Sequence, residues 1–134
     1  MTNPADLSLP EAAAALRSGA LTSRALTEAT LARIAALNPR VCAFTHIAVD
    51  ALQQADRADA RLRTEDPGPL CGLPVAVKDL IDVADQPATS GSRVLTGRIA
   101  ETDAPAIARL RAQGAVLIGK TATYEFAMVG PDLT

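Results

Sequence analysis

A single lysine, Lys78, closes the apolar run 72–77 and is followed at once by Asp79 and then by Asp82. A lysine in this position either forms an ion pair or takes part in chemistry. Burial disfavours the charged ammonium, so a lysine amine held among apolar groups can act as a base near neutral pH. The alternative is a lysine at the end of a strand, paired with one of the two carboxylates.

Two short apolar segments, 73–77 and 115–118, have the length and composition of buried strands. Between them the sequence predicts a long loop and then a helix over 104–113, with Pro105 in its first turn and Gly114 at its end. This order of strand, loop, helix and strand is typical of a right-handed parallel crossover. We therefore predict an α/β fold.

A helical hairpin is predicted over residues 8–38, ahead of this core. Ser8 and Glu11 have the spacing of a capping box, and Gly19 is placed to end the first helix. Thr22, or the serine after it, is expected to cap the second helix.

The second helix is predicted to end where Asn38 precedes Pro39. After it, residues 41–47 have the composition of a short strand, and residues 49–62 return to a helical pattern. The α/β core is therefore expected to occupy 41–134.

The composition fits one globular domain, since 49% of the 134 residues are hydrophobic and 21% are charged. The net charge of −2, the lack of a basic run and the three aromatic residues argue against direct binding of nucleic acid. No leader and no stretch of membrane-spanning length is apparent, so we expect a cytoplasmic protein that does not bind membranes. Cys42 and Cys71 match no metal-binding spacing and are expected to be small buried side chains in a reducing compartment.

Two further features resemble binding sites but have simpler explanations. Residues 114–121 match the written pattern of a phosphate-binding loop, but the predicted helix before them and the apolar residues within them indicate a strand. Lys120 and Thr121 are accordingly interpreted as supporting the end of that strand. His46 stands alone, without a second ligand at a suitable spacing, and is expected to be a hydrogen-bonded structural histidine. No metal site is predicted.

Several separate blocks of the chain, in order, resemble the N-terminal portion of the amidase signature family. They cover nearly the whole chain and comprise residues 21–39, 68–83, 89–92, 114–121 and 125–128. The resemblance implies a mixed sheet covered by helices and the hydrolysis of small-molecule carboxylic amides without a cofactor. In this family a serine is the nucleophile, a second serine bridges, and a lysine is the ultimate base.

The position of that lysine matches Lys78, which the resemblance therefore implies is catalytic. It also implies that Met128 lines the substrate pocket, although Phe126 and Met128 are equally well explained as ordinary core residues. Ser90 and Ser92 match a structural segment of the family, where their expected role is hydrogen bonding within a loop.

Both family serines would lie beyond residue 134, so residues 1–134 are expected to form the N-terminal segment of a single amidase domain. The isolated chain is then predicted to be inactive and to require the remainder of the amidase chain, or a self or partner chain. Two alternatives stay open. One is the A subunit of a tRNA-dependent amidotransferase, which shares these motifs. The other is a truncated, non-catalytic module that binds a partner through an unfinished sheet edge.

Overall fold

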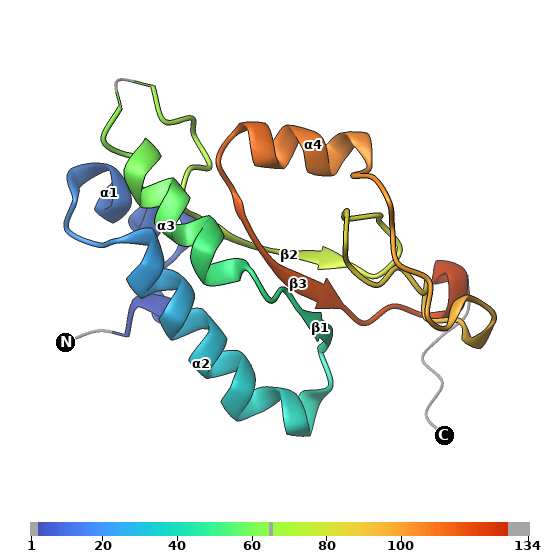
Figure 1. Ribbon diagram of the computed structural model, residues 1–134. Coiled ribbons are helices and arrows are strands. Elements are labelled where there is room, and N and C mark those ends of the chain that lie inside the picture. The colour runs from blue at the N-terminus through green and yellow to red at the C-terminus, as the bar shows by residue number, and fades with distance from the viewer. Residues whose placement is uncertain (1–2, 65, 129–134) are drawn as a thin grey trace.

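A computed structural model describes residues 3–64 and 66–128 of the protein (Figure 1). Residues 129–134, with which the predicted core segment ends, lie outside that description. The α-helices are α1 (Leu9–Ser18), α2 (Ser23–Val41), α3 (Ala51–Arg61) and α4 (Pro105–Ala112), the strands are β1 (Phe44–Ile47), β2 (Pro74–Lys78) and β3 (Val116–Thr121), and short 3-10 helices occupy Pro4–Asp6, Arg93–Leu95 and Glu125–Ala127.

The three strands form one mixed sheet in the order β1-β3-β2. Strands β2 and β3 run parallel with α4 between them along the chain, which confirms the predicted parallel pair, whereas β1 is antiparallel to β3. The fold is therefore α/β with a mixed sheet and helical cover, as the family resemblance implied.

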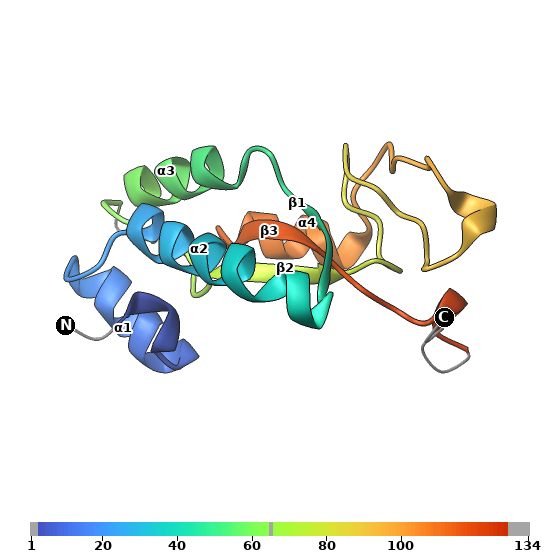
Figure 2. The same cartoon turned by 90° about the horizontal axis from the view of Figure 1, so that it is seen from below.

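Helices cover both faces of the sheet (Figure 1). On one face, alanines of α3 and apolar residues of α2 pack against Val116 and Ile118 of β3. On the other face, Ile107 of α4 packs against Leu117 and Val77. Figure 2 shows α1, α2 and α3 gathered towards one end of the molecule and the loops that follow β2 at the other.

The two parallel strands differ in burial. The β3 residues from Val116 to Lys120 are all buried, because β3 has a strand on each side and helices above and below. Strand β2 was predicted to be buried, but this is only partly correct: Val77 is buried, whereas Ala76 and Lys78 are exposed. Within the part of the chain that is described, β2 lies at an edge of the sheet.

The predicted helix caps are confirmed. The backbone N–H of Ser8 donates to a Glu11 carboxylate oxygen over 2.8 Å, and Gly19 ends α1 in the left-handed conformation. At the start of α2, the Thr22 hydroxyl accepts a hydrogen bond of 3.1 Å from the backbone N–H of Ala25.

The predicted end of α2 is wrong, because the helix continues through Pro39 to Val41. A proline biases the residue before it against helical geometry, but here the Asn38 carboxamide bonds the backbone N–H and C=O of Phe44. These two bonds hold Asn38 in the helix and fix the chain that leads into β1. Cys42 follows in the left-handed conformation and is exposed, contrary to expectation, whereas Cys71 is buried as expected.

A bulge in β3 determines which way its last residues face. Val75 lies opposite Leu117, but the next residue of β2, Ala76, lies opposite Gly119, so that Ile118 is an extra residue on β3. Beyond the bulge, Lys120 lies opposite Val77. None of the helices in the described ranges is both long and apolar enough to cross a membrane.

Candidate active site

The two parallel strands end side by side, with Lys78 of β2 opposite Thr121 of β3. The segment 79–104 leaves the sheet after β2, and the segment 122–128 leaves it after β3. In open α/β sheets, ligands bind in the crevice outside the carboxyl ends of the strands. We therefore place the candidate site at the carboxyl ends of β2 and β3.

The Lys78 side chain is exposed and makes no ion pair with any residue in the described ranges. Both carboxylates proposed as its partners are occupied elsewhere. Asp82 forms two hydrogen bonds of 2.7 Å with the guanidinium of Arg98, and these bonds hold the pKa of Asp82 below its ordinary value. Asp79 is buried and faces Lys120. The alternative of an ion-paired Lys78 is therefore wrong for the described residues.

The buried lysine is Lys120, which is fully enclosed, and its partner Asp79 is only 2% exposed. The Lys120 Nζ lies 3.3 Å from a carboxylate oxygen of Asp79 and donates a 2.8 Å hydrogen bond to the backbone oxygen of Pro87. This agrees with the interpretation of Lys120 as a support for the strand end. Pairing of Asp79 with Lys120 was not predicted, because it depends on the register of β3 across the bulge.

The other contacts of Asp79 shape the turn 89–92. Its carboxylate accepts a hydrogen bond of 3.1 Å from the backbone N–H of Thr89 and another from the Thr89 hydroxyl. That hydroxyl in turn accepts a hydrogen bond from the backbone N–H of Gly91. The buried carboxylate beside Lys78 therefore fixes the start of this turn.

The turn 89–92 also holds the segment 122–128, which follows β3. The Ser90 carbonyl accepts a 2.8 Å hydrogen bond from the backbone N–H of Phe126, and the buried Ser92 hydroxyl donates a 2.7 Å bond to the Glu125 carboxylate. The Ser92 hydroxyl therefore makes the hydrogen bonds predicted for it, whereas Ser90 contributes its backbone carbonyl.

Exposed apolar side chains follow both strands at this edge. Leu80 and Ile81 come after β2, and Tyr124, Phe126 and Met128 come after β3. Met128 is 84% exposed, so the alternative that Phe126 and Met128 are ordinary core residues is wrong for the chain as described. A pocket of about 640 Å³ opens beside the first group, and its lining includes Leu80, Ile81, Ser90, Leu95 and Pro105. The site therefore combines one free amine with an apolar surface.

His46 of β1 lies opposite Lys120, where its pKa is lowered by burial and, to a smaller extent, by the charge of Lys120. The hydrogen bond predicted for its ring is not found among the described residues. Nor do three or more His, Cys, Asp or Glu side chains come together there in a way that could hold a metal ion.

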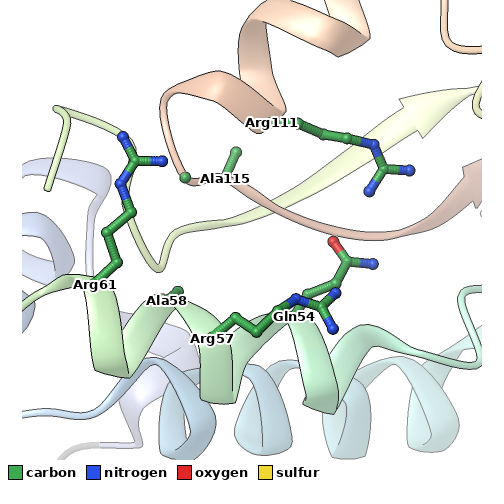
Figure 3. Close-up of a pocket in the computed structure, with 7 residues that line it drawn as sticks. Gln54, Arg57, Ala58, Arg61, Arg111 and Ala115 are labelled. Carbon is green, nitrogen blue, oxygen red and sulfur yellow. The ribbon is translucent and has the colours of Figure 1, made fainter.

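A second pocket, of about 270 Å³, lies between α3 and α4 near Gly114 and Ala115, at the opposite end of β3 (Figure 3). Two of its polar side chains, Arg111 and Gln54, are bonded within the fold, whereas Arg57 lies 3.6 Å from Asp50 and Arg61 makes no ion pair among the described residues. The Arg111 guanidinium lies 2.7 Å from Asp103, and the Gln54 carboxamide bonds both the N–H and the C=O of Leu117. Gln54 thus takes the place of a strand partner where β1 no longer reaches β3, so this residue of the pocket has a structural role.

Residues 25–131 match the family model described as Amidase, which accounts for most of the chain. The chain belongs to the amidase family. The matched range includes Lys78, the turn 89–92 and the segment 122–128, so the candidate site lies within the part of the chain that the family model matches.

The relatives of this amidase-family chain include both curated sequences and solved structures. It is 47% identical over 129 residues to a glutamyl-tRNA(Gln) amidotransferase subunit of Roseiflexus sp. (strain RS-1), covering 96% of this chain and 26% of that protein. It is 38% identical to the peptide amidase of Stenotrophomonas maltophilia, with a TM-score of 0.84 over 91% of this chain and 26% of that one. An amidase family protein of Bacillus anthracis is 28% identical, with a TM-score of 0.82 over 90% of this chain and 25% of the other. The chain thus spans about a quarter of the length of these relatives.

Proposed function

We propose that this chain supplies the base for the hydrolysis of carboxylic amides, and that Lys78 is that base. The observation that carries the proposal is the position of Lys78 at the carboxyl end of a parallel strand, exposed, with both neighbouring carboxylates committed to other cations. Membership of the amidase family supports the same chemistry.

The proposed reaction needs a neutral amine at Lys78. That amine accepts a proton, through a bridging serine, from the nucleophilic serine as the nucleophile attacks the amide carbonyl. The proton then passes to the departing nitrogen, and water releases the acid from the acyl-enzyme. Because the base, the nucleophile and the oxyanion donors are all protein groups, this mechanism requires no cofactor.

The chain provides only part of this machinery. We propose that both serines and the oxyanion donors come from further residues of the same protein or from a partner chain, which would also cover the exposed edge around Lys78. The relatives, of which this chain spans about a quarter, support that view. The isolated 134 residues are accordingly proposed to be inactive.

The proposed substrate is a small-molecule amide bound against the apolar residues that follow the two strands, with Met128 among them. The pocket beside Leu80 and Ile81 supports binding at the end of β2, and the exposure of Met128 leaves it free to contact a ligand, although it does not line that pocket. We propose a cytoplasmic location, in keeping with two free cysteines, one of which is exposed.

A second candidate function is that of the amidase-like subunit of a tRNA-dependent amidotransferase. It is favoured by curated relatives that are glutamyl-tRNA(Gln) amidotransferase subunits and are 43–47% identical over nearly the whole chain. The net charge of −2 weighs against this chain as the main contact for tRNA, and we propose that companion subunits would supply that contact. Recovery of a stoichiometric complex from the native host would favour this candidate, whereas a lone active amidase would exclude it.

The test of the main proposal is amide hydrolysis by the complete protein, measured as release of ammonia or amine. Lys78→Ala should lower kcat by about 1,000-fold or more, because the ultimate base is removed. Arg17→Ala is the matched control, since it removes an exposed cation from α1 at the other end of the molecule. Hydrolysis at the wild-type rate by the Lys78→Ala protein would overturn the proposal.

A further inference from the structure

Lys120 and Asp79 form a buried ion pair for which the proposed reaction has no direct use. Their side chains are 0% and 2% exposed, and the charged atoms lie 3.3 Å apart. Removing two charges from water is costly, and their mutual attraction offsets that cost only when further hydrogen bonds complete the site. Such a pair is weak evidence of stability, so its presence one residue from Lys78 calls for another explanation.

The pair joins three segments of the chain. Asp79 is the first residue after β2, Lys120 belongs to β3, and both bond the loop between β2 and α4. Lys120 donates to the carbonyl of Pro87, and Asp79 accepts from the N–H and hydroxyl of Thr89. The ends of both parallel strands and the start of the turn 89–92 are therefore held by the same two charges.

The pair also determines which charged groups surround Lys78. Lys78 is exposed whereas Asp79, the first residue after β2, is buried, so the two side chains have opposite surroundings. The buried Asp79 carboxylate is paired with Lys120 and makes no ion pair with Lys78. Without Lys120, that carboxylate would be an uncompensated charge and would have to leave its site or find another cation.

We propose that Lys120 and Asp79 are positioning residues for Lys78: together they fix the strand end that carries the base and the turn 89–92 beside it. This inference rests on the proposed function of Lys78. Neither residue is assigned contact with the substrate.

The test uses the complete protein and the variants Lys120→Met, Asp79→Asn and their combination. In Lys120→Met, hydrogen exchange at the amides of Thr89 and Gly91 should quicken by about tenfold or more, because these amides bond the network that the pair holds. Exchange in the β2 and β3 ladder should change less. The kcat should fall by about 100-fold, with a smaller change in KM, as expected for a displaced base.

Lys78→Met is the matched control, since it removes the other lysine at the same edge. It should abolish hydrolysis and leave exchange at Thr89 and Gly91 unchanged. If Lys78→Met retains activity, the proposed function fails, while the exchange data still test the pair. If Lys120→Met leaves both exchange and kcat at wild-type values, or speeds exchange equally over the whole chain, the positioning role is overturned.

The double variant keeps the test decisive if either single variant does not fold. It has no unpaired buried charge and should therefore fold better than the single variants. We expect it still to show fast exchange at the turn and a low kcat. Wild-type kcat in the folded double variant would overturn the inference.

Discussion

The chain contains two lysines, and they lie at the ends of neighbouring parallel strands in opposite surroundings. Lys78 of β2 is exposed and has no ion pair within the described residues, whereas Lys120 of β3 is fully enclosed and paired with Asp79. Each follows an apolar run, so residue type and local pattern do not distinguish them. What distinguishes them is the place of each strand in the sheet that the described residues form, with β2 at the edge and β3 at the centre.

The bulge at Ile118 explains the orientation of Lys120. Leu117 faces α4, and regular alternation would turn residues 119 and 121 to that same face. The extra residue instead brings Lys120 opposite Val77, whose side chain is also part of the core beneath α4. Lys120 is thereby directed inward towards Asp79, and Lys78, one residue beyond Val77, faces the other way.

The largest effect expected from this comparison is on stability. Lys120→Met should lower the free energy of unfolding by about 3–5 kcal/mol, because it leaves the Asp79 carboxylate buried without a partner. Lys78→Met should change it by about 0.5 kcal/mol or less, since that side chain is exposed. Denaturant unfolding of both variants measures the difference. Equal losses of stability would show that the two lysines are not distinguished by burial.

Much of the fold could be predicted from the sequence because its signals are local. The capping box at Ser8, the stop at Gly19 and the strand, helix and strand order around α4 all depend on neighbouring residues, and the structure contains each of them. The predicted end of α2 was wrong because the Asn38 carboxamide bonds the backbone of Phe44, six residues away. These bonds override the preference of a residue before proline for a non-helical conformation.

The candidate site was predictable only in part, for a related reason. Position in the family's pattern selected Lys78 as the candidate base, a role that stays a proposal. The partner of Asp79 depends instead on the register of β3, which a bulge shifts by one residue. A pattern along the chain does not reveal that shift. The role of Met128 in lining the substrate pocket stays a prediction, since its side chain is exposed and does not line the pocket beside Leu80 and Ile81.

Gly119→Ala would test the bulge itself. A Cβ at Gly119 would lie 2.2 Å from the carbonyl oxygen of His46, too close for β1 and β3 to stay paired as they are. We expect a loss of about 2–3 kcal/mol in the free energy of unfolding, typical of overpacking against backbone, together with exposure of Lys120 to amine-reactive reagents. Mass spectrometry of the labelled peptides measures the second effect.

Gly19→Ala is the matched control for Gly119→Ala. Gly19 also has a positive φ, but a Cβ there would meet no atom within 4 Å. Gly19→Ala should lower the free energy of unfolding only by the backbone strain, about 1 kcal/mol, and leave Lys120 protected from amine-reactive reagents. If both variants lose the same stability and protect Lys120 equally, close approach of β1 at Gly119 is not what directs Lys120 inward.

The smallest effect expected is on His46, the one histidine of the chain and the residue of β1 opposite Lys120. Burial, then the charge of Lys120, lower its pKa, while Asp79 acts in the other direction. A lowered pKa in the folded state means that the unfolded chain binds the proton more tightly. The contribution of His46 to stability is therefore complete above its unfolded pKa of about 6.5 and is lost as the pH falls through the lower folded value.

The two members of the buried pair should then move the His46 pKa in opposite directions, as followed by NMR titration of its ring. Lys120→Met removes a lowering charge and should raise the pKa part of the way to its ordinary value, because burial remains. Asp79→Asn removes a raising charge and should lower it further. Lys78→Met should leave it unchanged. The His46 pKa shift in Lys78→Met could instead equal the shift in Lys120→Met. Both lysine charges would then act equally on His46, which would contradict a structure in which the two side chains face opposite sides of the sheet.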